Sequence, residues 1–340
     1  MAKVWIVDRS HGQLGNRLML LSAVYAWCLE DGHELYYPGL HRYAHHFPAL
    51  DGQWFNSPTN PSRCGLPLKY RAAFQKRFVD VFRGLVRMKL ISGRLRPPKG
   101  NKACSFRPTD ANFPTLPRAG RGPGRYVVFS WRFNNPVGLV KYRRQIKALL
   151  APTPQVDADA AAFAATLPAR SSPGGGMVAR IAVHIRRTDY KTFLGGKHYH
   201  SIDRYKAEMT AVAALLRERH GIDSHFVLFS DEPLTAGQFE GFSVTISGGT
   251  MMQDLFRMSR LDGAIGPVST FSTYAMYLAG ASVYHFGPWA DEDGFDWVYN
   301  GLAVTRDAEV LATDIARVVR GSIEESLGEP GASGAARGRD

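Results

Sequence analysis

The chain has 340 residues, of which 45% are hydrophobic and 21% are charged. This balance is typical of a globular chain long enough for two domains, and it excludes the disordered and fibrous classes. No run approaches the roughly 20 apolar residues of a transmembrane helix, and the first residues lack a signal-peptide pattern, so we expect a cytoplasmic protein. Three scattered cysteines, Cys28, Cys64 and Cys104, exclude a disulfide framework.

The net charge of +12 is unevenly distributed along the chain. Residues 61–150 carry 21 basic side chains and only two acidic ones, Asp80 and Asp110. This region therefore has an excess of 19 positive charges, and the remainder of the chain is acidic. Such a local excess indicates an anionic partner for this region.

The first half of the sequence predicts the opening of an α/β domain with parallel strands. A glycine-bearing turn at 10–16 separates the first predicted strand from the first helix. The expected strands are 4–7, 34–37 and 125–131, and the expected helices are 18–28, 70–91, 137–150 and 152–167.

The second half alternates apolar strands with helices, which indicates a parallel sheet covered on both faces. The expected strands are 181–185, 226–229, 264–265 and 282–286, and the expected helices are 203–218, 251–259 and 272–279. Three consecutive glycines mark a linker. We therefore expect an N-terminal acceptor-binding domain at 1–167, a linker at 168–176, a donor-binding domain at 177–326 and a disordered tail at 327–340.

Polar side chains follow three of the predicted strands, where parallel sheets bind ligands. Arg186 and Arg187 end the first of these strands, and two guanidinium groups suit a diphosphate. Asp231 ends the second and offers a carboxylate to the paired N–H groups of a purine such as guanine. The segment 269–272 turns from a strand into a helix, whose amides and hydroxyls suit a phosphate.

Four short motifs, in this order, resemble the superfamily of α1,2-, α1,6- and protein O-fucosyltransferases. They are Gly-x-Leu-Gly-Asn at 12–16, His-Ile-Arg-Arg-Thr-Asp at 184–189, Phe-Ser-Asp at 229–231 and Ser-Thr-Phe-Ser at 269–272. The resemblance is closest to the bacterial α1,2-fucosyltransferases. It implies a GT-B fold, in which two Rossmann-like domains face each other across a cleft, and an inverting, metal-independent transfer from GDP-fucose.

The resemblance also implies roles for individual residues. Arg186 holds the β-phosphate, and His184 and Asp231 lie near the guanine. The remaining donor-binding residues are Gly12, Gly15, Asn16, Ser269, Thr270, Phe271 and Ser272. Two departures from the α1,2 branch, Arg17 in place of Gln and Thr188 in place of Gly, leave the linkage open.

The implied reaction is a direct displacement, in which a hydroxyl of a glycan acceptor attacks the anomeric carbon as GDP leaves. The acceptor expected is a galactoside of a bacterial surface polysaccharide. We expect Arg186 and Arg187, with the helix start near Ser272, to stabilise the charge that develops on the leaving diphosphate. Asp189 and Asp8 are both candidates for the general base.

Other segments have more than one interpretation. Asp157 and Asp159 imitate a metal-binding Asp-x-Asp motif, but their position at a helix start favours an acid–dipole interaction, and we expect no metal site. His41, His45 and His46 have ligand-like spacing without an acidic or thiol companion.

The basic helix at 70–91 either contacts an anionic membrane on the cytoplasmic side or packs its phenylalanines on the acceptor domain. The rival function is a non-catalytic protein that binds nucleic acid or an acidic polysaccharide through the basic region. Transfer of another GDP-sugar is a further alternative. Under the leading interpretation the partners are GDP-fucose and a glycan acceptor, with no nucleic acid.

Overall fold

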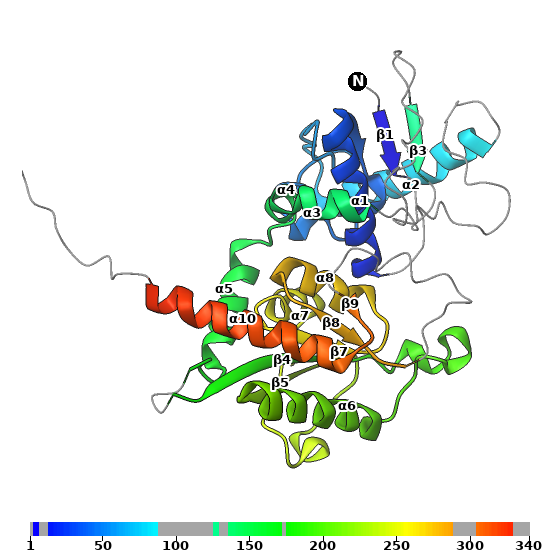
Figure 1. Cartoon of the computed structure of the whole chain (residues 1–340). Helices are drawn as coiled ribbons and strands as arrows, with labels where there is room; N and C mark the ends of the chain where they lie inside the picture. The colour runs from blue at the N-terminus through cyan, green and yellow to red at the C-terminus, as the bar shows by residue number, and fades with distance from the viewer. Residues whose placement is uncertain are drawn as a thin grey trace, which may run out of the picture.

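The computed structural model describes residues 3–6, 13–87, 125–128, 135–171, 175–287 and 304–328. Two parallel sheets organise these residues into two α/β units (Figure 1). The sheet of the N-terminal unit has the strand order β2-β1-β3. Its strands are β1 (Lys3–Ile6), β2 (Glu34–Tyr36) and β3 (Arg125–Val128).

The helices of the N-terminal unit surround this small sheet. The longest apolar one, α1, is buried along most of its length and ends at Gly32, which adopts a left-handed conformation with φ 66°. The expected helix at 137–150 is instead two helices, which meet at Tyr142; the hydroxyl of Tyr142 donates to Glu30 over 2.6 Å. The helices are α1 (Leu14–Asp31), α2 (Leu68–Arg87), α3 (Pro136–Lys141) and α4 (Arg143–Leu149).

The C-terminal unit contains a six-stranded parallel sheet with the order β6-β5-β4-β7-β8-β9. Two of its inner strands contain buried apolar runs, at 181–183 and 226–229, as expected for strands buried on both faces. The two short edge strands β6 and β9 were not predicted from the sequence. The strands are β4 (Met177–Ile185), β5 (Ile222–Ser230), β6 (Val244–Ile246), β7 (Gly263–Gly266), β8 (Val283–His285) and β9 (Val304–Thr305).

Helices cover both faces of this sheet, which confirms the prediction from the alternating pattern. One hydrophobic cluster joins the sheet to α6 and α10, and a second joins the opposite face to α7 and α8. A π-helical turn, Leu216–His220, extends α6. The helices are α5 (Pro154–Thr166), α6 (Ile202–Leu215), α7 (Met251–Met258), α8 (Thr270–Ala279) and α10 (Ala308–Gly328).

The helix α5 connects the two units and packs on α7. Asp159 accepts hydrogen bonds from Arg257 over 2.8 Å and from Gln253 over 2.9 Å, and Asp157 pairs with Arg260 over 2.5 Å. Both carboxylates of the Asp-x-Asp sequence are therefore engaged by basic side chains of the C-terminal unit.

The last helix, α10, was not predicted from the sequence. It runs to Gly328 and so includes the first two residues of the expected tail, whereas 329–340 lie outside the described residues. Across the described ranges, no helix combines the length and apolar character that crossing a bilayer demands.

The two units share one hydrophobic core, which includes side chains of α1, α3 and α8. Polar contacts cross the same interface: Ser22 lies 3.1 Å from the hydroxyl of Tyr274, and the hydroxyl of Tyr277 donates to the carbonyl of Leu139 over 2.8 Å. In Figure 1, α8 lies directly beneath α1. Two parallel α/β units that face each other in this way are the GT-B arrangement predicted from the sequence, so the fold class is confirmed.

The apolar side of α2 divides into a packed part and an exposed part. Phe78 and Phe82 lie 5.4 Å and 5.5 Å from the ring of Trp5, and Phe82 is buried. Tyr70 and Phe74 remain 55% and 41% exposed. Packing on the N-terminal unit therefore accounts for some of the aromatic rings of α2 but not for all of them.

Candidate functional site

A cavity of about 430 Å³ lies between the two units, at the carboxyl ends of β4, β5 and β7. Its volume falls within the range of ligand sites, and its position is the one at which parallel sheets bind ligands. The lining residues are Gln13, Gly15, Asn16, His184, Arg186, Thr188, Asp189, Tyr190, Phe193, His198, Phe229, Ser230, Asp231, Gly249, Met251, Asp254, Val268, Ser269, Thr270 and Phe271.

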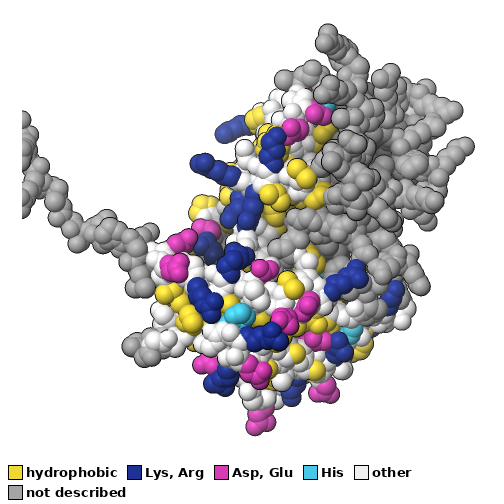
Figure 2. All heavy atoms as spheres, in the orientation of Figure 1, with side chains coloured by type: hydrophobic (Ala, Val, Ile, Leu, Met, Phe, Trp, Pro, Cys, Tyr) yellow, Lys and Arg dark blue, Asp and Glu magenta, His cyan; other side chains and the backbone are white. Residues whose placement is uncertain are grey.

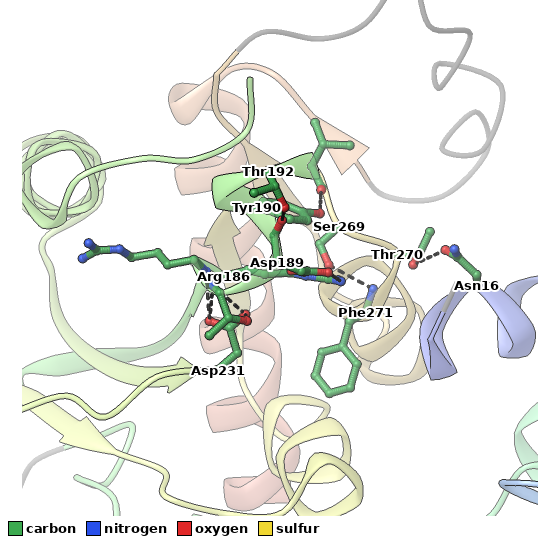
Figure 3. A network of polar contacts seen from close by, with 12 residues as sticks. Asn16, Arg186, Asp189, Tyr190, Thr192, Asp231, Ser269, Thr270 and Phe271 are labelled. Carbon is green, nitrogen blue, oxygen red and sulfur yellow. Dashed lines mark hydrogen bonds and ion pairs between the residues drawn. The ribbon is translucent and has the colours of Figure 1, made fainter. Parts of the chain in front are cut away.

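The N-terminal ends of α1 and α8 meet at this cavity. A Cβ atom on Gly15 would lie 2.7 Å from the backbone nitrogen of Phe271, so only glycine permits this approach. Next to Gly15, Asn16 accepts a hydrogen bond from the hydroxyl of Thr270 over 2.5 Å (Figure 3). Because the first amides of a helix lack intrahelical acceptors, two helix starts give this part of the cavity a positive potential.

Arg186 lines the cavity and is held in place by Asp189. Its Nε donates to one oxygen of Asp189 over 3.0 Å, and its Nη2 donates to the other over 2.6 Å. The guanidinium also lies over the ring of Tyr190, 4.6 Å from its centroid. The hydrogen bond from Arg186 holds the pKa of Asp189 below its ordinary value. Asp189 is therefore ionised near neutral pH and is a poor proton acceptor.

Arg187 does not line the cavity, where the sequence analysis expected both guanidinium groups. Its Nη2 donates to the hydroxyl of Tyr199 over 2.5 Å, and its Nε lies 3.1 Å from a carboxylate oxygen of Glu232. Successive side chains of an extended chain point to opposite sides, so the neighbour of Arg186 is directed away from it. One guanidinium therefore faces the cavity.

His184 brings a neutral imidazole to the cavity. The residue is 8% exposed, and its Nδ1 has no hydrogen-bond partner among the described residues. Burial, together with the nearby charge of Arg186, lowers the pKa of His184 to about 3. Its ring lies 5.4 Å from that of Phe271. An unpartnered ring nitrogen at the edge of a cavity is a ready contact for a polar ligand atom.

Asp231 lines the cavity but is already engaged by the loop after β4. Its carboxylate accepts hydrogen bonds from the backbone N–H of Arg187 over 2.8 Å, and from the N–H and hydroxyl of Thr188 over 3.2 Å and 2.5 Å. Figure 3 shows Asp231 below the loop that carries Arg186. The structure thus gives Asp231 a role in holding this loop, which competes with the expected contact to guanine.

Asp254 is a cavity carboxylate that the sequence analysis missed. It belongs to the first turn of α7 and accepts a hydrogen bond from the hydroxyl of Ser247 over 2.5 Å. Burial raises its pKa above the ordinary value. In the sequence it is indistinguishable from an acid that stabilises a helix start, so only the fold shows that it faces the cavity.

The remaining predicted residues divide into three groups. Ser269, Thr270 and Phe271 line the cavity as expected. Ser272 is fully buried and donates to the carbonyl of Ser269, and it does not line the cavity. Gly12 and the candidate base Asp8 lie outside the described residues. The lining residues that were not among the predicted site residues include Gln13, Thr188, Tyr190, Phe193 and His198.

The residues considered as metal ligands show no common site. In the part of the chain that the structure describes, no three His, Cys, Asp or Glu side chains cluster as metal ligands. The rings of His45 and His46 lie 3.9 Å apart, and burial lowers the pKa of His46.

No protein-family model matches the sequence, and no curated protein matches it. The structure is similar to that of a mutant of Arabidopsis thaliana FUT1 in complex with GDP, with 14% identity, a TM-score of 0.46, and 85% of this chain and 71% of that chain covered. It is also similar to POFUT1 in complex with GDP, with 12% identity, a TM-score of 0.41, and coverage of 84% and 99%.

A third similar structure is the E. coli heptosyltransferase WaaC with ADP-2-deoxy-2-fluoro heptose. Here the identity is 12% and the TM-score 0.37, with 96% of this chain and 100% of that chain covered. At such identities a likeness concerns the fold, so the activity has to be argued from the residues of the cavity.

Proposed function

We propose that this protein is an inverting, metal-independent glycosyltransferase that moves fucose from GDP-fucose to a hydroxyl group of a glycan. The observation that carries this proposal is the position of Arg186. Its guanidinium is fixed by Asp189 beside a cavity that also receives the starts of α1 and α8. A fixed cation and two helix starts in one cavity favour a ligand with several negative charges, such as a nucleoside diphosphate.

In this proposal the diphosphate lies between Arg186 and the helix starts. The first turn of α8 presents the amides of Thr270 and Phe271, and the hydroxyl of Ser269 already caps the second of these over 3.2 Å. The neutral ring of His184 offers a further polar contact without adding charge.

The nucleobase belongs, in this proposal, at the end of the cavity formed by β5 and α7. Asp254 offers there a carboxylate oxygen for the paired N–H groups of guanine. We assign this contact to Asp254 in preference to Asp231, because the amides and hydroxyl of the loop after β4 already occupy Asp231.

The reaction is a displacement at the anomeric carbon. The acceptor hydroxyl oxygen forms a bond to that carbon and releases its proton to water, the bond to the β-phosphate oxygen breaks, and negative charge develops on the departing GDP. Arg186 and the start of α8 stabilise this charge without having to move. Asp189 acts through Arg186 as a positioning residue, since its lowered pKa makes it a poor base.

For the acceptor we propose a galactoside of a bacterial surface polysaccharide, joined in α1,2 linkage. Support for this finer part comes from the resemblance of the segments 12–16 and 184–189 to the α1,2 branch. We also propose peripheral contact with an anionic membrane through the exposed face of α2. Tyr70, Phe74 and Val81 are exposed there at helical spacing, and Lys69 and Arg77 lie beside them.

The proposal is tested by calorimetric titration of GDP and by measuring GDP release from GDP-fucose with a panel of galactosides. We expect saturable GDP binding that Arg186→Ala abolishes and that Arg187→Ala leaves within about threefold, because the Arg187 side chain lies outside the cavity. GDP-mannose and ADP-heptose serve as alternative donors, and turnover in excess chelator tests metal independence.

Two outcomes would contradict this proposal. Salt-sensitive binding of nucleic acid or acidic polysaccharide that is indifferent to Arg186→Ala, without GDP binding, would support a binding protein instead. Figure 2 shows acidic and basic side chains interspersed over the visible face of the C-terminal unit, which is unlike the single-sign surface of a nucleic-acid-binding protein. Turnover of ADP-heptose but not of GDP-fucose would assign a different donor.

A further inference from the structure

Arg17 is a buried cation of the N-terminal unit that no carboxylate of the described residues neutralises. The residue is 7% exposed, and its Nη1 donates to the carbonyl of Gly39. Its guanidinium lies 5.7 Å from the centroid of the Tyr43 ring, and its Nε has no partner. Among the described residues, no acidic side chain pairs with Arg17. A buried cation without an anion is unfavourable unless a ligand supplies the opposite charge.

Further positive charge lies beside Arg17. The ring of His41 is half-buried, with its Nδ1 3.2 Å from the carbonyl of Pro38. Burial is the main cause that lowers the pKa of His41, and the charges of Arg17, Arg42 and Lys76 lower it further. These three cations therefore lie close to one imidazole, and no carboxylate of the described residues counteracts them there.

Packing of α2 on the segment after β2 fixes this arrangement. The side-chain amide of Asn56 donates to the carbonyl of Tyr37 over 3.0 Å and to Gln75 over 3.3 Å, which holds Gln75, the neighbour of Lys76, against this segment. Asp51, an acid on the same side of α2, is already paired with Arg71 over 2.5 Å. Neither Arg42 nor Lys76 forms an ion pair with a described residue. We call Arg17, His41, Arg42 and Lys76 the Arg17 cluster.

The Arg17 cluster is adjacent to the site described above. Asn16, which lines the cavity and binds Thr270, precedes Arg17 in α1, so their Cα atoms are about 3.8 Å apart. The cluster belongs to the unit opposite the donor side of the cavity. The residues of the cluster do not line the cavity itself, but Arg17 follows directly after a lining residue.

We propose that the Arg17 cluster binds an anionic group of the acceptor saccharide, a carboxylate or a phosphate ester. This inference rests on the proposed function and specifies its acceptor: the sugar that receives fucose carries, or adjoins, a uronic acid or a sugar phosphate. Arg17 supplies the buried charge, and Arg42 and Lys76 supply exposed charge that attracts the acceptor. Arg17 stands where the α1,2 branch has glutamine, and in this proposal that difference changes the acceptor specificity.

The test uses three acceptors that differ at a single sugar next to the accepting galactose: glucose, glucuronate and glucose 6-phosphate. We expect at least one acidic acceptor to have a KM about tenfold below that of the neutral one. The double variant Arg42→Ala/Lys76→Ala removes only exposed side chains. It should raise the KM for the acidic acceptor about fivefold and leave the KM for the neutral acceptor and the affinity for GDP unchanged.

Two further variants sharpen the test. Arg17→Gln restores the α1,2 residue and should remove the preference for acid, and its melting temperature reports whether it folds. Arg144→Ala, which removes an exposed cation from α4 of the same unit, should change none of these constants.

The inference is wrong if the wild type uses all three acceptors equally, or if the double variant raises the KM for neutral and acidic acceptors alike. Either result leaves the proposed function intact, because GDP binding and turnover persist. Absence of both GDP binding and turnover on every acceptor would instead overturn the proposed function, and the acceptor assignment with it. A preference for glucuronate over glucose 6-phosphate, or the reverse, identifies the source of the negative charge.

Discussion

The hydroxyl of Thr270 donates to the side-chain oxygen of Asn16 over 2.5 Å and joins the starts of α8 and α1 across 254 positions of sequence. Both residues line the cavity. The bond therefore connects the two units at the site where the diphosphate is proposed to bind. Small displacements of one helix start relative to the other change the positions of the groups that would hold the ligand.

Substitution of Gly15 by alanine adds only one methyl group, but it should disturb the contact between the starts of α1 and α8. A methyl group there meets backbone atoms of Thr270 and Phe271 at 2.7–2.9 Å, and backbone cannot rotate away as a side chain can. We expect Gly15→Ala to lower the free energy of unfolding by about 1–3 kcal/mol and to weaken GDP binding about tenfold. Denaturant titration and calorimetry measure both effects.

The matched control is Gly84→Ala on α2. Nothing lies within 4 Å of a Cβ atom at Gly84, so alanine should stabilise the helix by up to about 1 kcal/mol. Equal stability and GDP affinity for the two variants would show that α1 and α8 are not in close contact.

Of the three carboxylates that line the cavity, Asp231 and Asp254 should respond differently to neutralisation. Burial raises the pKa of Asp254, so replacing it by the neutral isostere should leave stability unchanged or increased. We expect Asp254→Asn to weaken GDP binding by about 1–3 kcal/mol. It should also reduce the difference in affinity between GDP and ADP. Competition titrations of the two nucleotides provide the measurement.

Asp231→Asn should instead lower the stability of the protein. Its carboxylate holds the N–H groups of Arg187 and Thr188, and the loss of these charge-assisted bonds should cost about 1–3 kcal/mol of unfolding free energy. If Asp231→Asn lost guanine selectivity without losing stability, the roles assigned to the two carboxylates would be reversed.

Stability should fall as the pH drops below 6.5, and His285 should contribute to this. His285 is buried against Thr273 and Gly266, and burial lowers its pKa to about 4. Since the unfolded chain binds a proton near pH 6.5, the stability is complete above that value and declines until the pH reaches about 4. At 1.36 kcal/mol per pH unit, the loss from this one group is about 2 kcal/mol at pH 5.

The variant His285→Asn isolates this contribution. It should be less stable than the wild type at pH 7.5, but its unfolding free energy should decline by about 2 kcal/mol less between pH 7 and pH 5. Parallel curves for the two proteins over this interval would show that His285 binds its proton equally well in both states.

The exposed apolar face of α2 predicts salt-sensitive binding to anionic vesicles. The double variant Tyr70→Ser/Phe74→Ser should lower the partition coefficient in a flotation assay about tenfold, because it removes two exposed aromatic rings beside basic residues. The control is Val137→Ser on α3, which is 54% exposed and should not alter binding. Vesicle binding that is equal for all three proteins, or absent from each, would exclude this face as a contact.

Local sequence patterns predicted most of the C-terminal unit. The apolar strand ends at Ile185 and Ser230 lie side by side in register, as the order of the segments implied. The short strands β6 and β9 and the long helix α10 escaped prediction; β9 is only Val304–Thr305, too short for a periodic pattern. The break between α3 and α4 depends on the hydrogen bond of Tyr142 to Glu30 of α1, a tertiary contact that no local pattern records.

The sequence predicted many residues of the candidate site but not the contacts between them. The sequence identified Arg186 and Asp189 as neighbours along the chain but did not show that they pair. It treated Arg187 as equivalent to Arg186, although alternation along an extended backbone sends the two side chains apart. Asp254 and Arg17 were missed as members of binding sites because one resembles a helix-start acid and the other an ordinary helix residue.

The pairing of Arg186 with Asp189 determines what an incoming phosphate meets. Nε and Nη2 each donate one N–H to the same carboxylate, so three of the five guanidinium N–H groups, two on Nη1 and one on Nη2, are not engaged by Asp189. If a diphosphate binds as proposed, this arginine still presents N–H groups of two nitrogens to it, and the paired carboxylate fixes their direction. A lysine at this position would keep the positive charge but could not form the two parallel hydrogen bonds to Asp189 that orient the side chain.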